Sequence, residues 1–318
     1  MNLPPNLKLM SVNLSVVIPT FRSPTTLGEL VERILGVAVW TDESEILIVD
    51  DGNTDETWDV ITSLAANYRC VRGFRLQQNF GQHSALLCGI RAAKNDVIVT
   101  LDDDLQNPPE EISRLLEALT EEVDVVIGKP NLASHSTFRR FTSDWSKEIL
   151  SRGLGYRNAT LISPFRLFRT RLRGSFGSQL GPNVSIDALL ALASNRFRAI
   201  YVQHDARTYG NSNYSLKKLS DFFLTNATSA SVVPLKIATK VGAVALLISL
   251  GLLFFTVSRR LIFGDVVTGF PFLASLIAAT SGVQLLMLGI LGQYIGHMHF
   301  RMIGTPSYVV VQVTEQSQ

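Results

Sequence analysis

The chain has 318 residues, of which 18% are charged, and its formal net charge is only +2. This length allows a large buried core in one or two domains, and the small charge is not that of a nucleic-acid-binding protein with a concentrated basic face. The two cysteines, Cys70 and Cys88, lack the spacing of a metal site or of a disulfide framework, so we expect free thiols.

Short apolar runs alternate with helical patterns through the first hundred residues. The apolar runs, rich in Val and Ile, cover residues 14–19, 45–49, 71–76 and 96–101. Stretches that suit helices lie between them, at residues 25–35, 56–66 and 82–94. Strands that alternate with helices form a mostly parallel sheet covered on both faces. Ligands of such sheets bind beyond the carboxyl ends of the strands.

Polar residues follow three of these runs. They are Pro19 and Thr20, then Asp50 and Asp51, then Asp102, Asp103 and Asp104. Because the carboxyl ends of parallel strands meet at one edge of a sheet, we expect these residues to share one rim. Three adjacent carboxylates repel one another unless a positive charge lies among them. The alternative is a solvated turn whose last acid caps a helix that starts near Pro108.

No phosphate-binding glycine motif follows the predicted strands, since neither a P-loop nor a G-x-G-x-x-G pattern occurs there. A phosphate ligand on an acidic rim therefore needs a bridging cation, and carboxylate oxygens suit Mg²⁺ or Mn²⁺. The rim predicts chemistry on a metal-bound diphosphate.

Apolar residues gather in the last third of the chain. Residues 241–257 contain no charge, and residues 266–295 contain no Asp, Glu, Lys or Arg. With their flanks, both segments approach the roughly 20 residues that a membrane-spanning helix needs. We therefore expect a transmembrane hairpin; two helices buried in a soluble core are the alternative.

Charges around this hairpin predict its orientation. Lysines precede the first segment and Arg301 follows the second, which favours the cytoplasm for both outer ends, whereas Arg259 and Arg260 in the short connection argue the other way. The N-terminus lacks the pattern of a signal peptide. We expect a multi-pass protein of the cell (inner) membrane whose large N-terminal domain is cytoplasmic.

Six motifs resemble a known family in their order and spacing. They are VVIPTF at 16–21, ILIVDDGNTDET at 46–57, NFGQHSALLCGI at 79–90, TLDDDLQNPPEEI at 100–112, RTYGNSNYSLKKL at 207–219 and GQYIGHMH at 292–299. Together they resemble the family 2 inverting glycosyltransferases of the type-A fold, in the polyprenyl-phosphate branch of dolichyl-phosphate mannose synthases and bacterial undecaprenyl-phosphate glucosyl and aminoarabinose transferases. The resemblance implies transfer of a sugar from a nucleotide donor, usually a UDP-sugar, to polyprenyl (undecaprenyl) phosphate in the bilayer, for cell-envelope glycan or lipid modification.

The resemblance also implies roles for the rim residues. Pro19 and Thr20 would line the nucleotide pocket, and Asp50 or Asp51 would recognise the base or ribose. Asp102 and Asp104 match the D-x-D pair whose metal, Mg²⁺ or Mn²⁺, binds the donor diphosphate, and Asp102 thereby also contacts the nucleotide.

Two further residues belong to the donor-sugar side of this pattern. Asp103 stands at the variable middle position of the D-x-D, where no specific contact is implied, and Gln106 lies where relatives often contact the donor sugar. A helix cap is the alternative for Gln106.

The resemblance implies that arginines bind phosphate groups on the acceptor side of the site. Arg207 begins an R-x-x-G-x-S-x-Y-S motif that in relatives lies near the active site and holds diphosphate or lipid phosphate, which suits bidentate Arg. Arg139 and Arg140 match the basic acceptor-side segment, where clustered cations attract an anionic headgroup. A surface loop for Arg207 and a solvated helix face for the other two are the alternatives.

The chain departs from the family pattern in two places. Asn213 stands where relatives have Lys, and near Thr160 there is no counterpart of the Asp that relatives place before the Arg corresponding to Arg166. The catalytic base is therefore unassigned, although a phosphate monoester is already ionised at neutral pH. Asp187 is either an acid that approaches the site from another segment or a helix N-cap, and His83 is expected to pack at the start of a helix.

We accordingly divide the chain into four parts. These are a glycosyltransferase domain at 1–212, a juxtamembrane amphipathic segment at 213–235, two transmembrane helices within 236–300 at about 237–258 and 267–295, and a cytosolic tail at 301–318. A homo-oligomer is the expected assembly. A processive polysaccharide synthase and a catalytically silent membrane scaffold remain as alternative functions.

Overall fold

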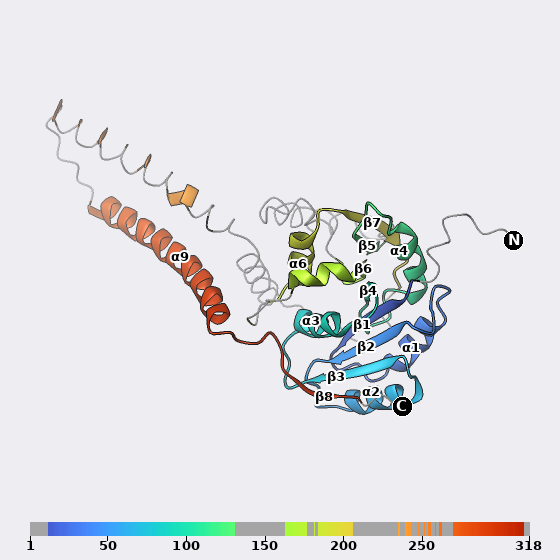
Figure 1. Cartoon of the computed structure of the whole chain (residues 1–318). Coiled ribbons are helices and arrows are strands. Elements are labelled where there is room, and N and C mark those ends of the chain that lie inside the picture. The colour runs from blue at the N-terminus through green and yellow to red at the C-terminus, as the bar shows by residue number, and fades with distance from the viewer. Residues whose placement is uncertain are drawn as a thin grey trace.

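A computed structural model describes residues 12–130, 163–176, 181, 184–205 and 270–314, together with scattered positions between 235 and 262. In this part of the chain, eight strands form one sheet in the order β7-β5-β6-β4-β1-β2-β3-β8 (Figure 1). The strands are β1 (Leu14–Thr20), β2 (Glu45–Asp50), β3 (Val71–Leu76), β4 (Val97–Thr100), β5 (Val125–Pro130), β6 (Arg166–Arg169), β7 (Phe197–Val202) and β8 (Val310–Val313).

The sheet is mostly parallel, as predicted. Strand β1 pairs in parallel with β2 and β4, β2 with β3, and β5 with β7. Among the strands of the described residues, only β6 and β8 run antiparallel to their neighbours. All residues of β1 and β2 are buried, because a parallel strand in mid-sheet is covered on both faces.

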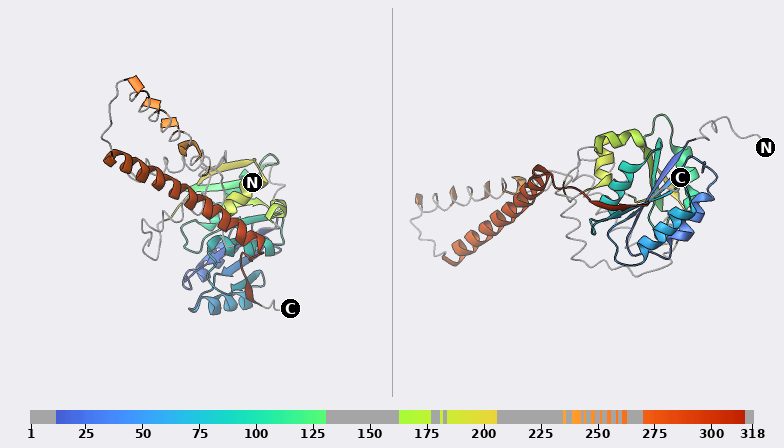
Figure 2. Two further views of the ribbon diagram at one scale, coloured as in Figure 1. Left: turned by 90° about the vertical axis from the view of Figure 1, so that its left-hand side faces the viewer. Right: turned by 60° about the horizontal axis from the view of Figure 1, so that its bottom comes forward.

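Helices cover both faces of the sheet (Figure 2). They are α1 (Leu27–Leu35), α2 (Thr57–Asn67), α3 (Gln82–Ala92), α4 (Ile112–Ala118) and α6 (Ile186–Ala193), with 3₁₀ turns at Pro109–Glu111 and Thr170–Phe176. Alternate strand residues divide between two apolar clusters, one with α1, α2 and α4 and the other with α3 and α6. In α1, the spacing of Leu27, Leu30, Val31 and Ile34 presents one apolar stripe to the first cluster.

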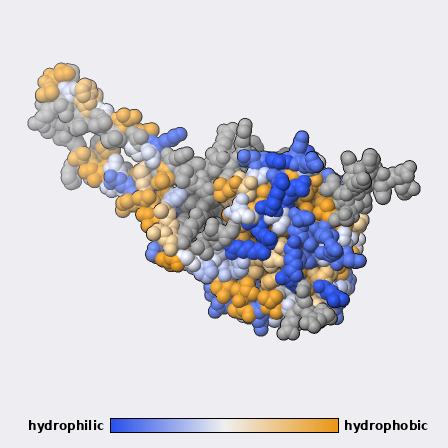
Figure 3. Space-filling model, in the orientation of Figure 1, coloured by the Kyte–Doolittle hydropathy of each residue, from blue (hydrophilic) through white to orange (hydrophobic). Residues whose placement is uncertain are grey.

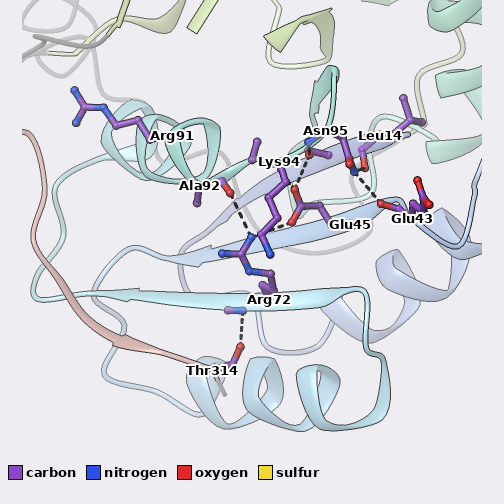
Figure 4. A network of polar contacts seen from close by, with 12 residues as sticks. Leu14, Glu43, Glu45, Arg72, Arg91, Ala92, Lys94, Asn95 and Thr314 are labelled. Carbon is purple, nitrogen blue, oxygen red and sulfur yellow. Dashed lines mark hydrogen bonds and ion pairs between the residues drawn. The ribbon is translucent and has the colours of Figure 1, made fainter. Parts of the chain in front are cut away.

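A polar network around the buried carboxylate of Glu45, the first residue of β2, closes the amino-terminal edge of the sheet (Figure 4). Glu45 Oε1 accepts from the Ser15 hydroxyl at 2.7 Å and from the Lys94 backbone N–H at 2.6 Å, and Arg72 Nη1 donates to Oε2 at 2.9 Å. Both carboxylate oxygens therefore have partners, as buried polar groups require.

The C-terminal region contains a 33-residue helix, α9 (Phe270–Met302), which projects away from the α/β domain and covers most of the second predicted span (Figure 1). Within the described part of the chain, no helix has both the length and the sustained hydropathy required to cross a membrane. The first predicted span falls on residues that are described only in part.

After α9 the chain returns to the domain. Strand β8 pairs antiparallel with β3 at the edge of the sheet, where the Gly73 N–H donates to Thr314 Oγ1 at 2.8 Å. The sequence pattern of residues 301–318 predicts only a tail. The difference arises because an edge strand gains its stability from a partner far away in the chain, which local pattern does not reveal.

Candidate active site

The predicted rim forms at the carboxyl edge of β1, β2 and β4. Thr20 is in register with Asp50, and the Asp51 N–H donates to the Thr20 carbonyl at 3.1 Å. The Leu101 N–H donates to the Val17 carbonyl at 3.1 Å, which carries the acids that follow β4 to the same edge. The sheet thus brings together the three polar segments that lie far apart in the sequence.

The three acids after β4 each have different surroundings. Gln82 Nε2, in the first turn of α3, donates to Asp102 Oδ1 at 2.7 Å. Asp104 Oδ1 accepts from the Gln106 N–H at 3.2 Å, which closes a tight turn in which Leu105 has a φ of 60°. Strand β4 ends at Thr100, and the three acids that follow shortly after it form a polar turn.

Asp103 lies between this turn and β1. Burial raises its pKa, although the nearby hydroxyls of Thr20 and Ser23 favour its charged form. By geometry, however, neither Asp103 Oδ2 nor Thr20 Oγ1 completes a hydrogen bond with another described residue. Asp103 therefore faces the strand end that was predicted to line the nucleotide pocket.

The surroundings of Asp102 disfavour its charged form. Burial raises the pKa of Asp102 to about 7, and the charges of Asp104 and Asp103 act in the same direction. The Arg166 charge and the Gln82 hydrogen bond oppose this rise without cancelling it. A cation near Asp102 would favour its ionised form.

Capping does not explain these acids. The 3₁₀ turn Pro109–Glu111 and helix α4 both begin without a side-chain cap. The Gln106 backbone, rather than its side chain, supplies the observed contacts, through its N–H to Asp104 and its carbonyl to the Asp205 N–H at 2.9 Å. The capping alternatives for the last acid and for Gln106 are therefore wrong at these two helix starts.

The structure separates Asp50 from Asp51. Both oxygens of Asp51 accept backbone N–H groups, from Phe80 at 2.8 Å and from Gly81 at 2.9 Å. Asp51 therefore anchors the loop that leads into α3. Burial raises its pKa, against these two hydrogen bonds.

The two oxygens of Asp50 have different surroundings. The Asn53 N–H donates to Asp50 Oδ1 at 2.8 Å, whereas Oδ2 lies 3.6 Å from Arg75 Nε and has no hydrogen-bond partner in the part of the chain that the structure describes. Burial raises the pKa of Asp50 above its usual range. The turn between these residues needs Gly52, whose φ is 72° and whose added Cβ would lie 2.3 Å from the Gln78 carbonyl carbon.

A buried arginine lies beside the acids, and sequence reasoning assigned it no role. Arg166, at the start of β6, is 2% exposed, and its Nη1 bonds to Asp187 Oδ1 in the first turn of α6. A charged residue between Phe165 and Leu167 in an apolar run is the sequence signal that could have indicated a buried, paired arginine.

The structure shows where Asp187 and His83 lie, near the start of α6. Ser185, not Asp187, is the N-cap of α6, so Asp187 approaches the site as an acid paired with Arg166. His83 lies in the first turn of α3, where its Nδ1 accepts from the Ile186 N–H at 3.3 Å, and burial lowers its pKa. Its packing at a helix start agrees with the prediction.

Several predicted site residues lie outside the described residues. They are Arg139, Arg140 and Arg207, with Thr160 and Asn213, where the chain departs from the family pattern. Among the described residues, Pro19 is buried at the end of β1. In the same part of the chain, no group of three His, Cys, Asp or Glu side chains is arranged to hold a metal ion.

A mostly parallel sheet between helical layers, with a carboxylate pair just after a central strand, defines the class of type-A glycosyltransferases. Residues 15–175 match the family described as Glycosyl transferase family 2. The chain belongs to this family, which confirms the resemblance seen in the motifs.

Relatives are similar to the chain over nearly its whole length. An undecaprenyl-phosphate 4-deoxy-4-formamido-L-arabinose transferase of Serratia proteamaculans is 33% identical over 304 residues, which covers 94% of this chain and 93% of that protein. A protein of the same name from Sodalis glossinidius is 30% identical over 307 residues, which covers 95% and 94%.

A solved structure shares the fold. It is glucosyl-3-phosphoglycerate synthase from Mycobacterium tuberculosis in complex with Mn²⁺ and uridine-diphosphate-glucose, with a TM-score of 0.50, 17% identity and coverage of 71% of this chain and 83% of that one. At this identity the likeness concerns the fold alone.

Proposed function

We propose that this chain is a membrane-bound inverting glycosyltransferase that moves a sugar from a nucleotide-sugar donor, a UDP-sugar, to undecaprenyl phosphate. One observation carries the proposal: at the carboxyl edge of the sheet, Asp50 and Asp103 each have a buried oxygen without a hydrogen-bond partner among the described residues, in a chain that aligns over 94% of its length with an undecaprenyl-phosphate transferase. The proposed product is an undecaprenyl-phosphate sugar for cell-envelope modification.

Buried polar atoms that lack a hydrogen-bond partner among the described residues support a ligand at this edge. Seven buried side-chain atoms lack a hydrogen-bond partner among the described residues, and three of them are Thr20 Oγ1, Asp50 Oδ2 and Asp103 Oδ2. Buried polar groups without partners are rare, and each calls for an explanation such as a bound ligand. We assign Pro19, Thr20 and Asp50 to the nucleotide pocket, with Asp51 holding the adjacent loop.

The donor set of Asp102 and Asp104 fits a divalent cation. Hard carboxylate oxygens suit Mg²⁺ or Mn²⁺, and Mg²⁺ commonly takes one or two carboxylates and completes its coordination with substrate phosphates and water. Two acids therefore suffice where the diphosphate supplies other oxygens. The cation, when bound, stabilises negative charge that develops on the leaving nucleoside diphosphate.

The chain's own residues set up the displacement. An oxygen of the lipid phosphate attacks the anomeric carbon, the bond from that carbon to the diphosphate breaks, and the nucleoside diphosphate leaves with the bonding electron pair. Because the second pKa of a phosphate monoester is about 6, the attacking oxygen needs no base at neutral pH. In this proposal Arg207, Arg139 and Arg140 bind the acceptor phosphate, and Gln106 with Asp103 borders the donor sugar.

The C-terminal region supports attachment to a bilayer. Large apolar side chains are exposed along α9, and the surface view shows them gathered on the arm that leaves the domain (Figure 3). These include Leu273, Ile277, Leu285, Leu288, Ile295 and Met298. An exposed apolar surface of this extent indicates a membrane or protein contact. We propose the transmembrane hairpin at about 237–258 and 267–295, with the domain cytoplasmic and a homo-oligomeric assembly.

Activity on a panel of donors tests the proposal. Purified protein in detergent receives MnCl₂, undecaprenyl phosphate and nucleotide sugars, including UDP-4-deoxy-4-formamido-L-arabinose, UDP-glucose and UDP-galactose. Mass spectrometry follows the lipid product, and nucleoside diphosphate release is measured in parallel. We expect a lipid carrying a single sugar, formed by the wild type but not after EDTA treatment.

Matched variants locate the activity. Asp104→Ala should lose the product, whereas Asp42→Asn, which neutralises an exposed acid before β2, should retain it. A polymer instead of one sugar would favour the polysaccharide synthase. Absence of product with every donor, from folded protein that binds nucleotide, would favour the silent scaffold.

A further inference from the structure

Arg166 brings a full positive charge into the core beside the acidic turn. Thr100 is in register with Arg166, so the guanidinium starts from the strand that leads into Asp102. Phe168, two residues further along β6, belongs to the apolar cluster of α3 and α6, which places Arg166 on that face. An arginine stays protonated even when buried, so its charge must be balanced by neighbouring acids.

Two acids compete for this charge. Asp187 holds Nη1 of Arg166 and is itself 21% exposed at its side chain. Asp102 is close enough for the Arg166 charge to act on it, and Nε of Arg166 has no hydrogen-bond partner among the described residues. The described contacts therefore pair Arg166 with Asp187, while its charge still acts on Asp102 and its Nε remains without a hydrogen-bond partner in this part of the chain.

Asp102 has a neutral partner instead. Its Oδ1 accepts from Gln82 at 2.7 Å, a bond that orients the carboxylate without neutralising it. A salt bridge from Arg166 would occupy the same carboxylate and repel a cation at the site. The first turn of α6 suits the negative charge of Asp187, because the helix dipole is positive there.

We propose that Asp187 is a positioning residue: by holding the Arg166 guanidinium in an ion pair, it keeps Arg166 from binding Asp102 and so leaves Asp102 available to the divalent cation. This inference rests on the proposed function, because it requires a metal at Asp102. Asp187 acts only through Arg166 and touches neither donor nor acceptor.

The proposal predicts that a second change reverses the effect of the first on Mn²⁺ binding. In Asp187→Asn the charge of Arg166 is uncompensated and turns to Asp102, so Mn²⁺ must displace a salt bridge. In the double variant Arg166→Met with Asp187→Asn, the competing charge is gone, and the cation site regains its affinity. Replacement of a buried ion pair by apolar and neutral side chains is often tolerated in folding.

Calorimetric titration of MnCl₂ into the full-length protein in detergent, at a fixed excess of UDP, measures this directly and needs no turnover. We expect Asp187→Asn to weaken Mn²⁺ binding roughly tenfold, the scale of one charge interaction in a partly screened interior. The double variant should bind within about threefold of wild type, since the two changes are coupled rather than additive. Asp187→Glu should restore binding.

Asp124→Asn is the matched control. Asp124 accepts from Arg171 at 2.6 Å and from Ser194 at 2.8 Å, at the far end of β6 from the acidic turn. The same chemical change there should lower thermal stability and leave Mn²⁺ affinity unchanged. Thermal unfolding of every variant reports whether it is folded.

The outcomes separate the two proposals. If the wild type binds Mn²⁺ with UDP but Asp187→Asn binds equally well, or if the double variant binds more weakly than the single one, the inference is wrong and the proposed function stands. If the folded wild type binds UDP but no Mn²⁺, both the metal assignment and the inference fail. In activity assays, the half-saturating Mn²⁺ concentration should rise in Asp187→Asn while kcat at saturating Mn²⁺ changes little.

Discussion

Acidic side chains at the two edges of the central sheet differ in how completely they are hydrogen-bonded. At the amino edge, every oxygen of Glu45 is paired, and Asp124 has an arginine and a serine as donors. At the carboxyl edge, Asp50 and Asp103 each have an oxygen without a hydrogen bond to any described residue. Burial alone therefore does not mark a functional acid.

The pKa directions follow the same division. Burial raises the pKa of Asp124, but hydrogen bonds from Arg171 and Ser194 outweigh it and bring the pKa below its usual range. Burial dominates at the other edge and raises the pKa of Asp50 and of Asp102. The acids of the amino edge are therefore fully paired within the fold, whereas those of the carboxyl edge are less completely paired among the described residues.

The largest expected effect comes from neutralising the acidic turn. Asp102→Asn should lower the turnover by about a thousandfold, because a metal contributes several kcal/mol of charge stabilisation and each 1.36 kcal/mol is about tenfold in rate. Without metal, the same variant should unfold at an equal or higher temperature than wild type, since one of three repelling carboxylates is removed. Lipid-product formation and thermal unfolding in EDTA check both halves.

A marked fall in stability without metal would contradict this account, because it would make Asp102 a structural acid like Glu45. Asp42→Asn serves as the control in both measurements, since it removes an equal charge from an exposed position.

Glu45→Gln should show the reverse pattern. The amide keeps one acceptor oxygen, so either Arg72 or the Ser15 and Lys94 donors lose their partner in a buried network. We expect the free energy of unfolding to fall by about 2 kcal/mol and the activity of the folded enzyme to stay within twofold of wild type. Thermal unfolding and product formation on the same preparation measure this. A loss of turnover with unchanged stability would contradict the proposal that the acids of the amino edge serve stability and not activity.

The sequence predicted which residues gather at the carboxyl edge of the sheet, but it predicted no role for the amino edge. The strands β1 to β4 were predicted within one or two residues, because parallel strands buried on both faces read as continuous runs of Val and Ile. Strands β5, β6, β7 and β8 were not predicted. Of these, β6 and β8 have four residues each and pair antiparallel with strands far away in the chain, so neither length nor periodicity identifies them.

The acids of the site show the same limit. Asp102 and Asp104 follow from the end of a strand, a feature that local pattern reveals. The difference between Asp50 and Asp51 depends on the Phe80 and Gly81 N–H groups, which lie about thirty residues away. The pairing of Arg166 with Asp187 likewise depends on how β6 meets α6. Contacts between segments that are distant in the chain could not be predicted from the sequence alone.

The smallest expected effect is a pH dependence at the amino edge. The pKa of Asp124 is lowered in the folded protein, so its charge stabilises the fold above the unfolded pKa of about 4, and this contribution is lost as the pH falls through the folded value. The difference in stability between wild type and Asp124→Asn should therefore be about 1 kcal/mol at pH 6 and shrink towards zero below about pH 4. Thermal unfolding of the two proteins side by side at several pH values measures it, and the titration of all other groups cancels in the difference. A difference that persists unchanged at pH 3 would mean that packing, not charge, gives Asp124 its role, and the contrast between the two edges would then rest on the carboxyl edge alone.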